Sequence, residues 1–384
     1  MKVALVHDWL TGMRGGERVL EVLCELFPDA DIYTLLHVDG SVSPTIERHR
    51  IHSTFIRRLP QAKTKYRFYL ILFPFAAERI DLSGYDLILS SSHCVAKNVR
   101  VPEGACHISY VHTPMRYVWD QFDAYFGPGR ANLPVRVAMR AVRPWLQKRD
   151  VETSRRVNHF IANSRHVARR IERHYGREAE VIYPPVDVDR FSPSARDEGY
   201  YLMVTAFAPY KRVDLAIEAF NRTGLPLRII GSGQDGARLR SMAGRNIEFI
   251  GWGTDAEVSE AYAGCKALIF PGEEDFGIVP VEAMASGKPV IAYGRGGVLD
   301  TVVPLDGHGS LNGASSNSRA PTGIFFQEQS PDSLIQALRR FEANRHRFDS
   351  ERMARHARSF HRSSFKERLQ EFVREKYDRF QNPV

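Results

Sequence analysis

The second half of this chain alternates short apolar runs with helix-like segments, and no other feature constrains its fold as strongly. Between residues 200 and 293, runs typical of buried strands are separated by segments whose apolar residues recur at helical spacing. Strands that alternate with helices of about ten residues indicate β-α-β units and a parallel sheet. The predicted strands are 200–207, 227–230, 247–250, 267–270, 290–293 and 323–326, and the predicted helices are 213–221, 235–243, 255–263, 281–286, 331–343 and 350–360.

The first half shows the same alternation. It predicts strands at 2–10, 30–36, 86–92, 107–112, 159–163 and 179–183, and helices near 15–27, 134–157 and 164–175. A chain of 384 residues is longer than one domain usually is, so we expect two α/β domains. Prolines and polar residues at 184–199 mark their boundary. The expected domains are residues 1–187 and 188–362, followed by an amphipathic helix at 363–384, and residues 303–322 are expected to form a mobile loop.

The composition is that of an ordinary globular protein. Hydrophobic residues make up 43% and charged residues 26% of the sequence. The longest apolar run, at 69–77, is about half as long as a membrane span. The first strand begins directly after Met1 and Lys2, so we expect no signal peptide. The scattered cysteines argue against a zinc site or a disulfide framework and favour the cytoplasm; they are Cys24, Cys94, Cys106 and Cys265.

Positive charge is concentrated in two stretches of the first half. The chain carries 53 basic and 45 acidic residues, a net charge of +8, which favours anionic partners. Aromatic residues are interleaved with the bases of the first stretch. This pattern fits an anionic bilayer surface, nucleic acid, or a helix with one packed aromatic face and one solvated basic face. The bases are Arg50, Arg57, Arg58, Lys63, Lys65, Arg67 and Arg79 in the first stretch, and Arg130, Arg136, Arg140, Arg143, Lys148 and Arg149 in the second.

Residues 271–290, with the sequence PGEEDFGIVPVEAMASGKPV, form the strongest candidate for a binding site. They follow a predicted strand and open a predicted helix, and ligands of open α/β sheets bind at the carboxyl ends of strands. Backbone N–H groups at a helix N-terminus favour an anion such as a phosphate. Glu274 and Glu282 have seven residues between them, and carboxylates accept strong hydrogen bonds from sugar or ribose hydroxyls. A nucleotide-sugar would use all of these groups at once.

This pattern, Glu-x7-Glu around a Phe-Gly turn followed by Glu-Ala-Met-Ala-x-Gly-x-Pro-Val, resembles the donor-site signature of the retaining family-4 glycosyltransferases. The resemblance implies the GT-B fold, in which two Rossmann-like, doubly wound parallel-sheet domains face each other across a cleft. It implies that Glu274 faces the transferred sugar and that Glu282 holds the ribose. The alternative for either glutamate is a simple interaction with the helix dipole. The expected donor-binding residues of the turn itself are Phe276, Gly277, Ile278 and Val279, with backbone N–H groups of the last three on the diphosphate.

The resemblance also implies basic residues at the first turn of the second domain. Family members use an arginine and a lysine there to neutralise the diphosphate. Lys211 matches the lysine, whereas the arginine position is occupied by Ala206. We expect Arg212, or a base from the other domain, to compensate. Two bases at a helix start are disfavoured by the helix dipole, which favours a functional role over a solvated one. Gly231, in a Gly-Ser-Gly turn after a strand, is also expected on the donor side.

Two features of the first domain are candidates for the same site. Gly15 and Gly16 lie between a predicted strand and a helix, which suits either a phosphate-binding loop or a plain tight turn. His112 ends a predicted strand before a proline, and its alternative role is that of a buried, hydrogen-bonded histidine. In the resembled family the glycine loop lies against the donor diphosphate, and a histidine at this point contacts the donor sugar.

The resemblance implies a retaining hexosyltransferase with His112, Lys211 and Glu274 as catalytic residues. The sequences of residues 209–214 and 112–114 most resemble those of mannosyltransferases that use GDP-mannose for bacterial surface polysaccharide. We expect no metal and no cofactor, a lipid-linked or oligosaccharide acceptor, and a cytoplasmic location, peripheral on the inner face of the membrane. Two alternatives stay open at this point. One is another GT-B enzyme, such as a sugar-nucleotide epimerase, a phosphorylase or a UDP-sugar transferase, and the other is a nucleic-acid-binding protein.

Overall fold

The chain divides into two compact units, each with its own parallel sheet. The computed structural model describes residues 1–129, 131–306 and 320–382. The first unit consists of Met1–Pro185 and Phe365–Val384, and the second of Val186–Ser364. The expected boundaries, after residues 187 and 362, lie two residues from these. Arg130 and most of the loop predicted at 303–322, namely residues 307–319, lie outside the described part of the chain.

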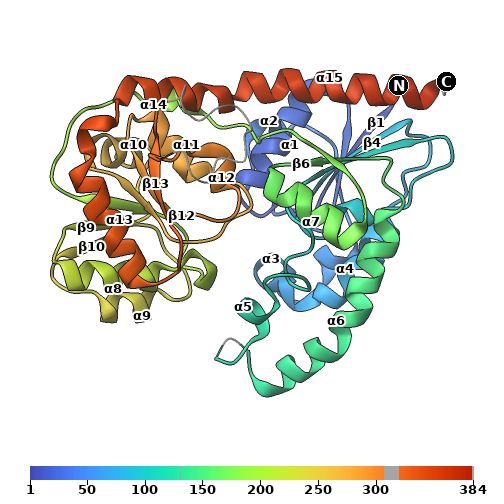
Figure 1. Cartoon of the computed structure of the whole chain (residues 1–384). Coiled ribbons are helices and arrows are strands. Elements are labelled where there is room, and N and C mark those ends of the chain that lie inside the picture. The colour runs from blue at the N-terminus through green and yellow to red at the C-terminus, as the bar shows by residue number, and fades with distance from the viewer. Residues whose placement is uncertain (130, 307–319, 383–384) are drawn as a thin grey trace. The chain divides into compact units, whose positions relative to one another are not determined.

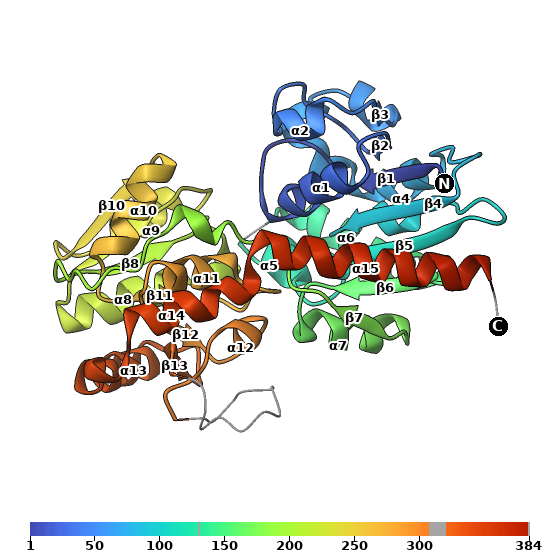
Figure 2. The same ribbon diagram turned by 90° about the horizontal axis from the view of Figure 1, so that it is seen from above.

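Within the described residues, the first unit is built on a seven-stranded parallel sheet (Figure 1). Its strand order is β3-β2-β1-β4-β5-β6-β7, which can be followed in Figure 2. The sequence predicted each of these strands except β3, which lies at the start of the first basic stretch. Three residues are too few to show a periodic pattern. The strands are β1 (Val3–His7), β2 (Asp31–Thr34), β3 (Ile51–Ser53), β4 (Leu87–Ser92), β5 (Cys106–Val111), β6 (His159–Ala162) and β7 (Ala179–Val181).

Helices cover both faces of this sheet. Ser164 caps α7, because its Oγ atom accepts the N–H of Val167 at 3.1 Å. The last helix, α15, packs Phe365, Leu369 and Phe372 into the core of the first unit, and Figure 2 shows it lying along β5 and β6. The helices are α1 (Gly15–Leu26), α2 (Pro44–Glu47), α3 (Ala62–Lys65), α4 (Phe73–Glu78), α5 (Phe122–Phe126), α6 (Leu133–Ser154), α7 (Arg165–Tyr175) and α15 (Arg362–Gln381).

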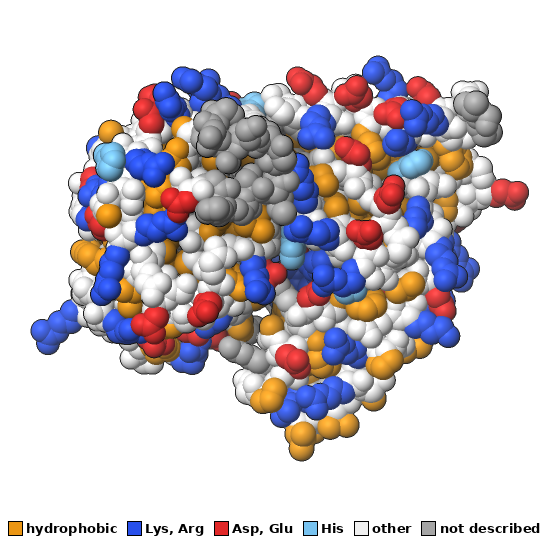
Figure 3. Space-filling model, viewed as in Figure 1, with side chains coloured by type: hydrophobic (Ala, Val, Ile, Leu, Met, Phe, Trp, Pro, Cys, Tyr) orange, Lys and Arg blue, Asp and Glu red, His pale blue; other side chains and the backbone are white. Residues whose placement is uncertain are grey.

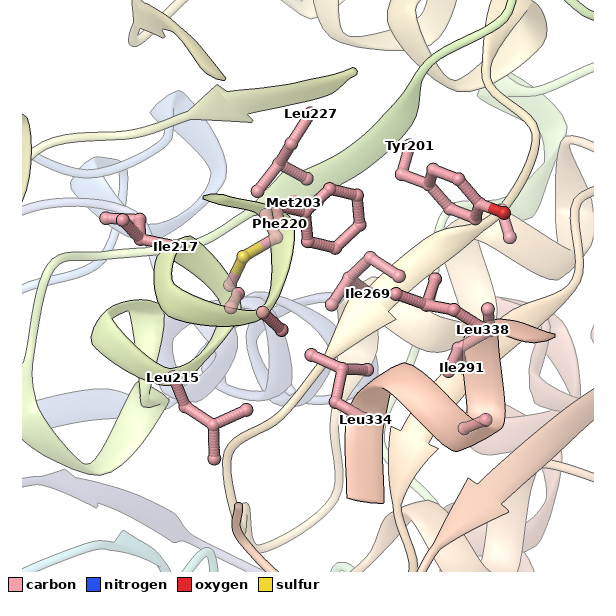
Figure 4. Packing of buried hydrophobic residues seen from close by; sticks show 14 of the residues in the cluster. Tyr201, Met203, Leu215, Ile217, Phe220, Leu227, Ile269, Ile291, Leu334 and Leu338 are labelled. Carbon is pink, nitrogen blue, oxygen red and sulfur yellow. The ribbon is translucent and has the colours of Figure 1, made fainter. Parts of the chain in front are cut away.

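The second unit has, in its described part, a six-stranded parallel sheet with the order β10-β9-β8-β11-β12-β13. A core cluster of this unit joins the sheet to α8 and α13, as Tyr201, Phe220 and Leu338 illustrate (Figure 4). The strands are β8 (Tyr201–Val204), β9 (Leu227–Ile230), β10 (Ile247–Gly251), β11 (Leu268–Phe270), β12 (Val290–Tyr293) and β13 (Gly323–Phe326). The helices are α8 (Val213–Thr223), α9 (Gly236–Met242), α10 (Asp255–Gly264), α11 (Ile278–Ala285), α12 (Val298–Thr301), α13 (Pro331–Ala343) and α14 (Ser350–Ala357).

One helix boundary matters for the site. The helix predicted at 281–286 begins at Ile278 instead, directly after Gly277. Gly277 has φ = 87°, a left-handed conformation that glycine adopts without steric cost. Pro280 lies in the first turn of α11, where its missing N–H leaves no broken hydrogen bond. The helix therefore starts inside the motif and presents its N-terminus beside Glu274.

Candidate active site

Several of the predicted site residues follow strands at the points where the strand order of each sheet reverses. In the first sheet β1 neighbours β4, and in the second β8 neighbours β11. Ligands of open parallel sheets bind beyond the carboxyl ends of the strands at such switch points. Gly16 follows β1, Lys211 follows β8 and Glu274 follows β11. The topology therefore places the strongest candidates where ligands of this fold class bind.

Lys211 and Glu274 form an ion pair in the second unit. Their Nζ and Oε1 atoms are 2.5 Å apart, and the two side chains are 16% and 19% exposed. The backbone of Glu274 is held as well, since its carbonyl oxygen accepts the N–H of Gly297 at 2.8 Å. Charged hydrogen bonds in a partly buried site are stronger than those at an open surface. The pair therefore fixes an amine and a carboxylate beside the start of α11.

The residues whose backbone N–H groups the sequence predicted as donors lie at the N-terminus of α11. Ile278 and Val279 are in its first turn, where N–H groups have no partner within the helix. Gly277 lies next to them as the N-cap residue. The side chain of Phe276 is buried and packs edge-on against Phe360, with ring centroids 5.8 Å apart. Phe276 would therefore meet a ligand through its backbone rather than its ring.

Glu282 is oriented by a buried tyrosine. The hydroxyl of Tyr262 donates a hydrogen bond to Oε2 of Glu282 at 3.0 Å. Burial, and then the charge of Glu282, raises the pKa of Tyr262 well above its ordinary value, so the hydroxyl keeps its proton and remains a donor. Tyr262 lies on α10, twenty residues before Glu282, and the sequence analysis did not identify it. Its aromatic type alone gave no signal for this role.

The side chain of Arg212 contacts other residues near the turn. Its Nε atom lies 3.4 Å from Oδ1 of Asp214, and its Nη1 donates to Oε1 of Gln329 at 3.3 Å. Gln329 in turn donates to the carbonyl of Pro271 at 2.9 Å. Ala206, at the position of the family arginine, is exposed. The side chain of Arg212 thus braces the start of the motif.

Close packing explains why position 231 is occupied by glycine. A Cβ atom at this position would lie 1.8 Å from the carbonyl oxygen of Thr205, and its φ of 144° also disfavours other residues. The turn after β9 therefore packs directly on the backbone that follows β8. The structure shows this contact, and a contact of Gly231 with a ligand remains a prediction.

In the first unit, the glycine turn and His112 lie together. A Cβ atom on Gly16 would lie 3.3 Å from Cε1 of His7 and 3.7 Å from Nε2 of His112. Gly15 begins α1. His112 is buried, and its Nε2 atom lies 2.8 Å from Oγ of Ser91. The sequence predicted Gly16 and His112 but not His7 or Ser91, since nothing in their spacing marks them.

Among the described residues, no group of three or more histidine, cysteine, aspartate or glutamate side chains is arranged to hold a metal ion. The chain contains two Asp-x-Asp pairs, at 29–31 and 187–189. Asp189 contacts Nε2 of His361 at 2.8 Å, and Asp31 accepts a hydrogen bond from Tyr85. In the described part of the chain, no helix is both long enough and apolar enough to cross a bilayer.

Comparison with known proteins assigns the chain to a family. The family described as Glycosyltransferase Family 4 matches residues 13–190, and the family described as Glycosyl transferases group 1 matches residues 187–360. The chain is 39% identical over 131 residues to a GDP-mannose-dependent alpha-mannosyltransferase of Mycobacterium tuberculosis. This match covers 31% of the chain and 34% of that protein. An uncharacterized glycosyltransferase of Methanocaldococcus jannaschii is 31% identical over 163 residues, which are 41% of the chain and 46% of that protein.

The fold agrees with this assignment. The solved structure of Anabaena HepE in complex with UDP has a TM-score of 0.68 to this chain at 15% identity, and the alignment covers 98% of this chain and 100% of that one. The predicted GT-B fold with two parallel α/β sheets is confirmed. The chain belongs to the family-4 glycosyltransferases. It spans 34% and 46% of the length of the two curated relatives described above.

Proposed function

We propose that this protein is a retaining glycosyltransferase that moves a hexose from a nucleotide-sugar to an acceptor hydroxyl. The observation that carries the proposal is the Lys211–Glu274 ion pair beside the N-terminus of α11. It combines a cation, a carboxylate and backbone donors at the carboxyl edge of a parallel sheet, where a nucleotide-sugar would need them. Membership of the family-4 glycosyltransferases supports the same reaction.

In the proposed mechanism the bond between the sugar and the diphosphate breaks, and negative charge develops on the leaving phosphate. Lys211 and the N–H groups of Ile278 and Val279 stabilise this charge as it forms. Glu274 holds the sugar hydroxyls and acts as an anchor rather than a nucleophile. The acceptor hydroxyl attacks on the same face, and the leaving phosphate takes its proton, which retains the anomeric configuration. Glu282, oriented by Tyr262, holds the ribose.

The donor that we propose is GDP-mannose. The sequence of residues 209–214 supports this donor, and so does the likeness to relatives named as GDP-mannose-dependent mannosyltransferases. The alternative is a UDP-sugar, because the structural neighbour from Anabaena was solved with UDP. The two donors share the diphosphate and differ in the base, so they can be distinguished by binding alone.

A thermal-shift panel of GDP-, UDP- and ADP-sugars tests this assignment. We expect GDP-mannose to give the largest rise in Tm, because a ligand that binds only the native state stabilises it by about 2.7 kcal/mol at a hundred times its Kd. The Lys211→Ala variant should show a smaller shift with every nucleotide-sugar. A larger shift with a UDP-sugar would assign the other donor. No shift with any of them would contradict the site.

We propose further that the acceptor is lipid-linked and that the first unit docks on an anionic bilayer. The supporting surface, here called the basic-apolar surface, combines exposed apolar and basic side chains from the first basic stretch and α6. Phe75 and Trp145 stack on it with ring centroids 5.4 Å apart. Figure 3 shows hydrophobic and basic side chains gathered at the lower end of α6. Its exposed residues are Phe68, Phe75, Leu133, Val137, Trp145, Arg58, Lys63, Lys65 and Arg140.

Several bases of the two basic stretches bind other groups of the protein. Arg57 is paired with Asp39 at 2.9 Å, Arg143 donates to the carbonyl of Val118 at 2.8 Å, and Arg149 pairs with Glu78. Aromatic residues of the first stretch divide as well, because Tyr66 and Phe73 are core residues whereas Phe68 is 80% exposed. The stretch is therefore partly a packed element and partly an open surface.

Sedimentation with vesicles tests the docking surface. We expect binding to vesicles that contain anionic lipid, and weaker binding at high salt, because each base near such a surface contributes about 1 kcal/mol that salt screens. Lys63/Lys65→Glu should weaken this binding at least about thirty-fold, because the loss of the two bases alone amounts to about 2 kcal/mol and the new carboxylates are repelled by the anionic lipid. Arg169/Arg173→Glu on α7, an equal change of charge elsewhere on the first unit, should have little effect. Equal binding to neutral and anionic vesicles would contradict the proposal.

A further inference from the structure

Polar side chains lie side by side across the carboxyl ends of three neighbouring strands of the first sheet. His7 ends β1, Ser91 lies opposite it in β4, and His112 directly follows β5. The Oγ atom of Ser91 lies 3.2 Å from Nδ1 of His7 and 2.8 Å from Nε2 of His112. One buried hydroxyl therefore joins the two imidazole rings.

Glu17 of α1 completes this row. Its Oε1 atom lies 3.8 Å from Nε2 of His7, an electrostatic contact longer than a hydrogen bond. Its Oε2 atom accepts the N–H of Arg14 at 3.1 Å. Burial raises the pKa of Glu17, but the contact with His7 outweighs this effect and lowers the pKa below its ordinary value. The row thus ends in a carboxylate that is only 3% exposed.

His93 and Asp8 border the row without belonging to it. The carboxylate of Asp8 accepts the N–H groups of the four residues 93–96, at 2.6 to 2.9 Å, and lies 3.2 Å from Nδ1 of His93. Burial, and then the charge of the nearby Arg116, lowers the pKa of His93 well below its ordinary value. His93 is therefore neutral, and Glu17 is the charged group in contact with His7.

We propose that Glu17 sets the tautomer of His112 through His7 and Ser91. An ionised carboxylate attracts an N–H group, so His7 carries its proton on Nε2 and its Nδ1 is an acceptor. The hydroxyl of Ser91 then donates to Nδ1 of His7. Its oxygen accepts from Nε2–H of His112, which leaves Nδ1 as the basic nitrogen of His112. Each proton along the row has one assigned position.

This inference rests on the proposed function for its consequence. If His112 touches the transferred sugar, its Nδ1 accepts a hydrogen bond from a sugar hydroxyl instead of donating one. Glu17, His7 and Ser91 are then positioning residues that act through His112. Gly16 covers the row, since a side chain there would press on His7 at 3.3 Å. This gives the second glycine of the turn a role apart from phosphate binding.

Nitrogen-15 NMR of the full chain with labelled histidine tests the tautomer directly, and His112→Gln assigns the signal. We expect neutral His112 to carry its proton on Nε2 in the unaltered protein. In Glu17→Gln, the amide donates to Nε2 of His7, which reverses every donor along the row. The proton of His112 then moves to Nδ1. Glu21→Gln, a change of the same kind one turn later on α1, should leave the signal unchanged.

Ser91→Ala provides a second variant that does not touch the cap of α1. It removes the link, so His112 should show both tautomers. Glu17→Gln should also lower kcat/KM for the nucleotide-sugar about tenfold while the Kd of the free nucleoside diphosphate stays constant. A proton on Nδ1 in the unaltered protein, or an unchanged His112 signal in both variants, would overturn the proposal. If the His112 tautomer changes in the variants as expected but the protein transfers no sugar, the proposed function is rejected and the proposal about the tautomer stands.

Discussion

Glu274→Ala is expected to lower kcat/KM by a factor of about 30 to 1000 without unfolding the protein. Loss of a contact that holds the transferred sugar in the transition state costs about 2 to 4 kcal/mol, and 1.36 kcal/mol is a tenfold change in rate. The variant also leaves Lys211 without its carboxylate partner at 2.5 Å. Because Lys211 is 16% exposed, water can solvate the freed amine, so the free energy of unfolding should change little.

Steady-state kinetics and a melting curve on the same sample check this expectation. Glu273→Ala removes the neighbouring carboxylate of the same turn and serves as the matched control, with a small expected effect on kcat/KM. Glu274→Gln keeps the shape but not the charge, and it should lie between the alanine variant and the unaltered protein. Normal turnover by Glu274→Ala would show that the sugar binds elsewhere.

Asp150→Ala is expected to lower the free energy of unfolding by about 3 to 5 kcal/mol. Asp150 and Lys97 form an ion pair in which both side chains are 1% exposed. Trp119 and Tyr175 each donate to Oδ2 of Asp150 at 2.8 Å. Removing one partner of a buried pair leaves an uncompensated charge, and this is the large term. Since Asp150 belongs to α6, the loss should loosen that helix first.

Urea unfolding measures this change as a shift of the midpoint at constant m-value. Glu152→Ala, on the same helix but with a side chain that is 42% exposed, is the control and should cost less than about 1 kcal/mol. The double variant Lys97→Met/Asp150→Leu should recover only part of the lost stability. It removes the uncompensated charge, but Trp119 and Tyr175 lose the acceptor of their hydrogen bonds. A loss below about 1 kcal/mol in Asp150→Ala would contradict the structural role of the pair.

The sequence predicted the structure well where a feature depends on residues that are close together in the chain. Apolar runs gave nearly all strands, because a buried strand needs consecutive apolar residues. The motif around Glu274 and Glu282 predicted the candidate site of the second unit, because both glutamates and the helix start lie within one short segment. The secondary structure of the first basic stretch was harder to predict. The stretch contains β3 and several short turns, and none of them is long enough to show a hydrophobic periodicity.

The remaining site residues depend on contacts between distant segments. Ser91 meets His7 across 84 residues and His112 across 21, and the register of three parallel strands brings them together. No local pattern encodes that register, so no local pattern predicts the row. Tyr262 is similar, because its partner Glu282 lies on another helix. The residues that orient a site are therefore harder to find from sequence than those that define its motif.

The final helix gives the first unit a special order of assembly during synthesis. Phe365, Leu369, Phe372 and Val373 complete the core of a unit whose other residues end at Pro185. A ribosome adds roughly 5 to 20 residues per second, so the partial unit waits for tens of seconds at the slower rate while the second unit emerges. During this interval its core lacks four apolar side chains. The two units thus differ in their exposure to chaperones and proteases, and the second can finish folding before the first.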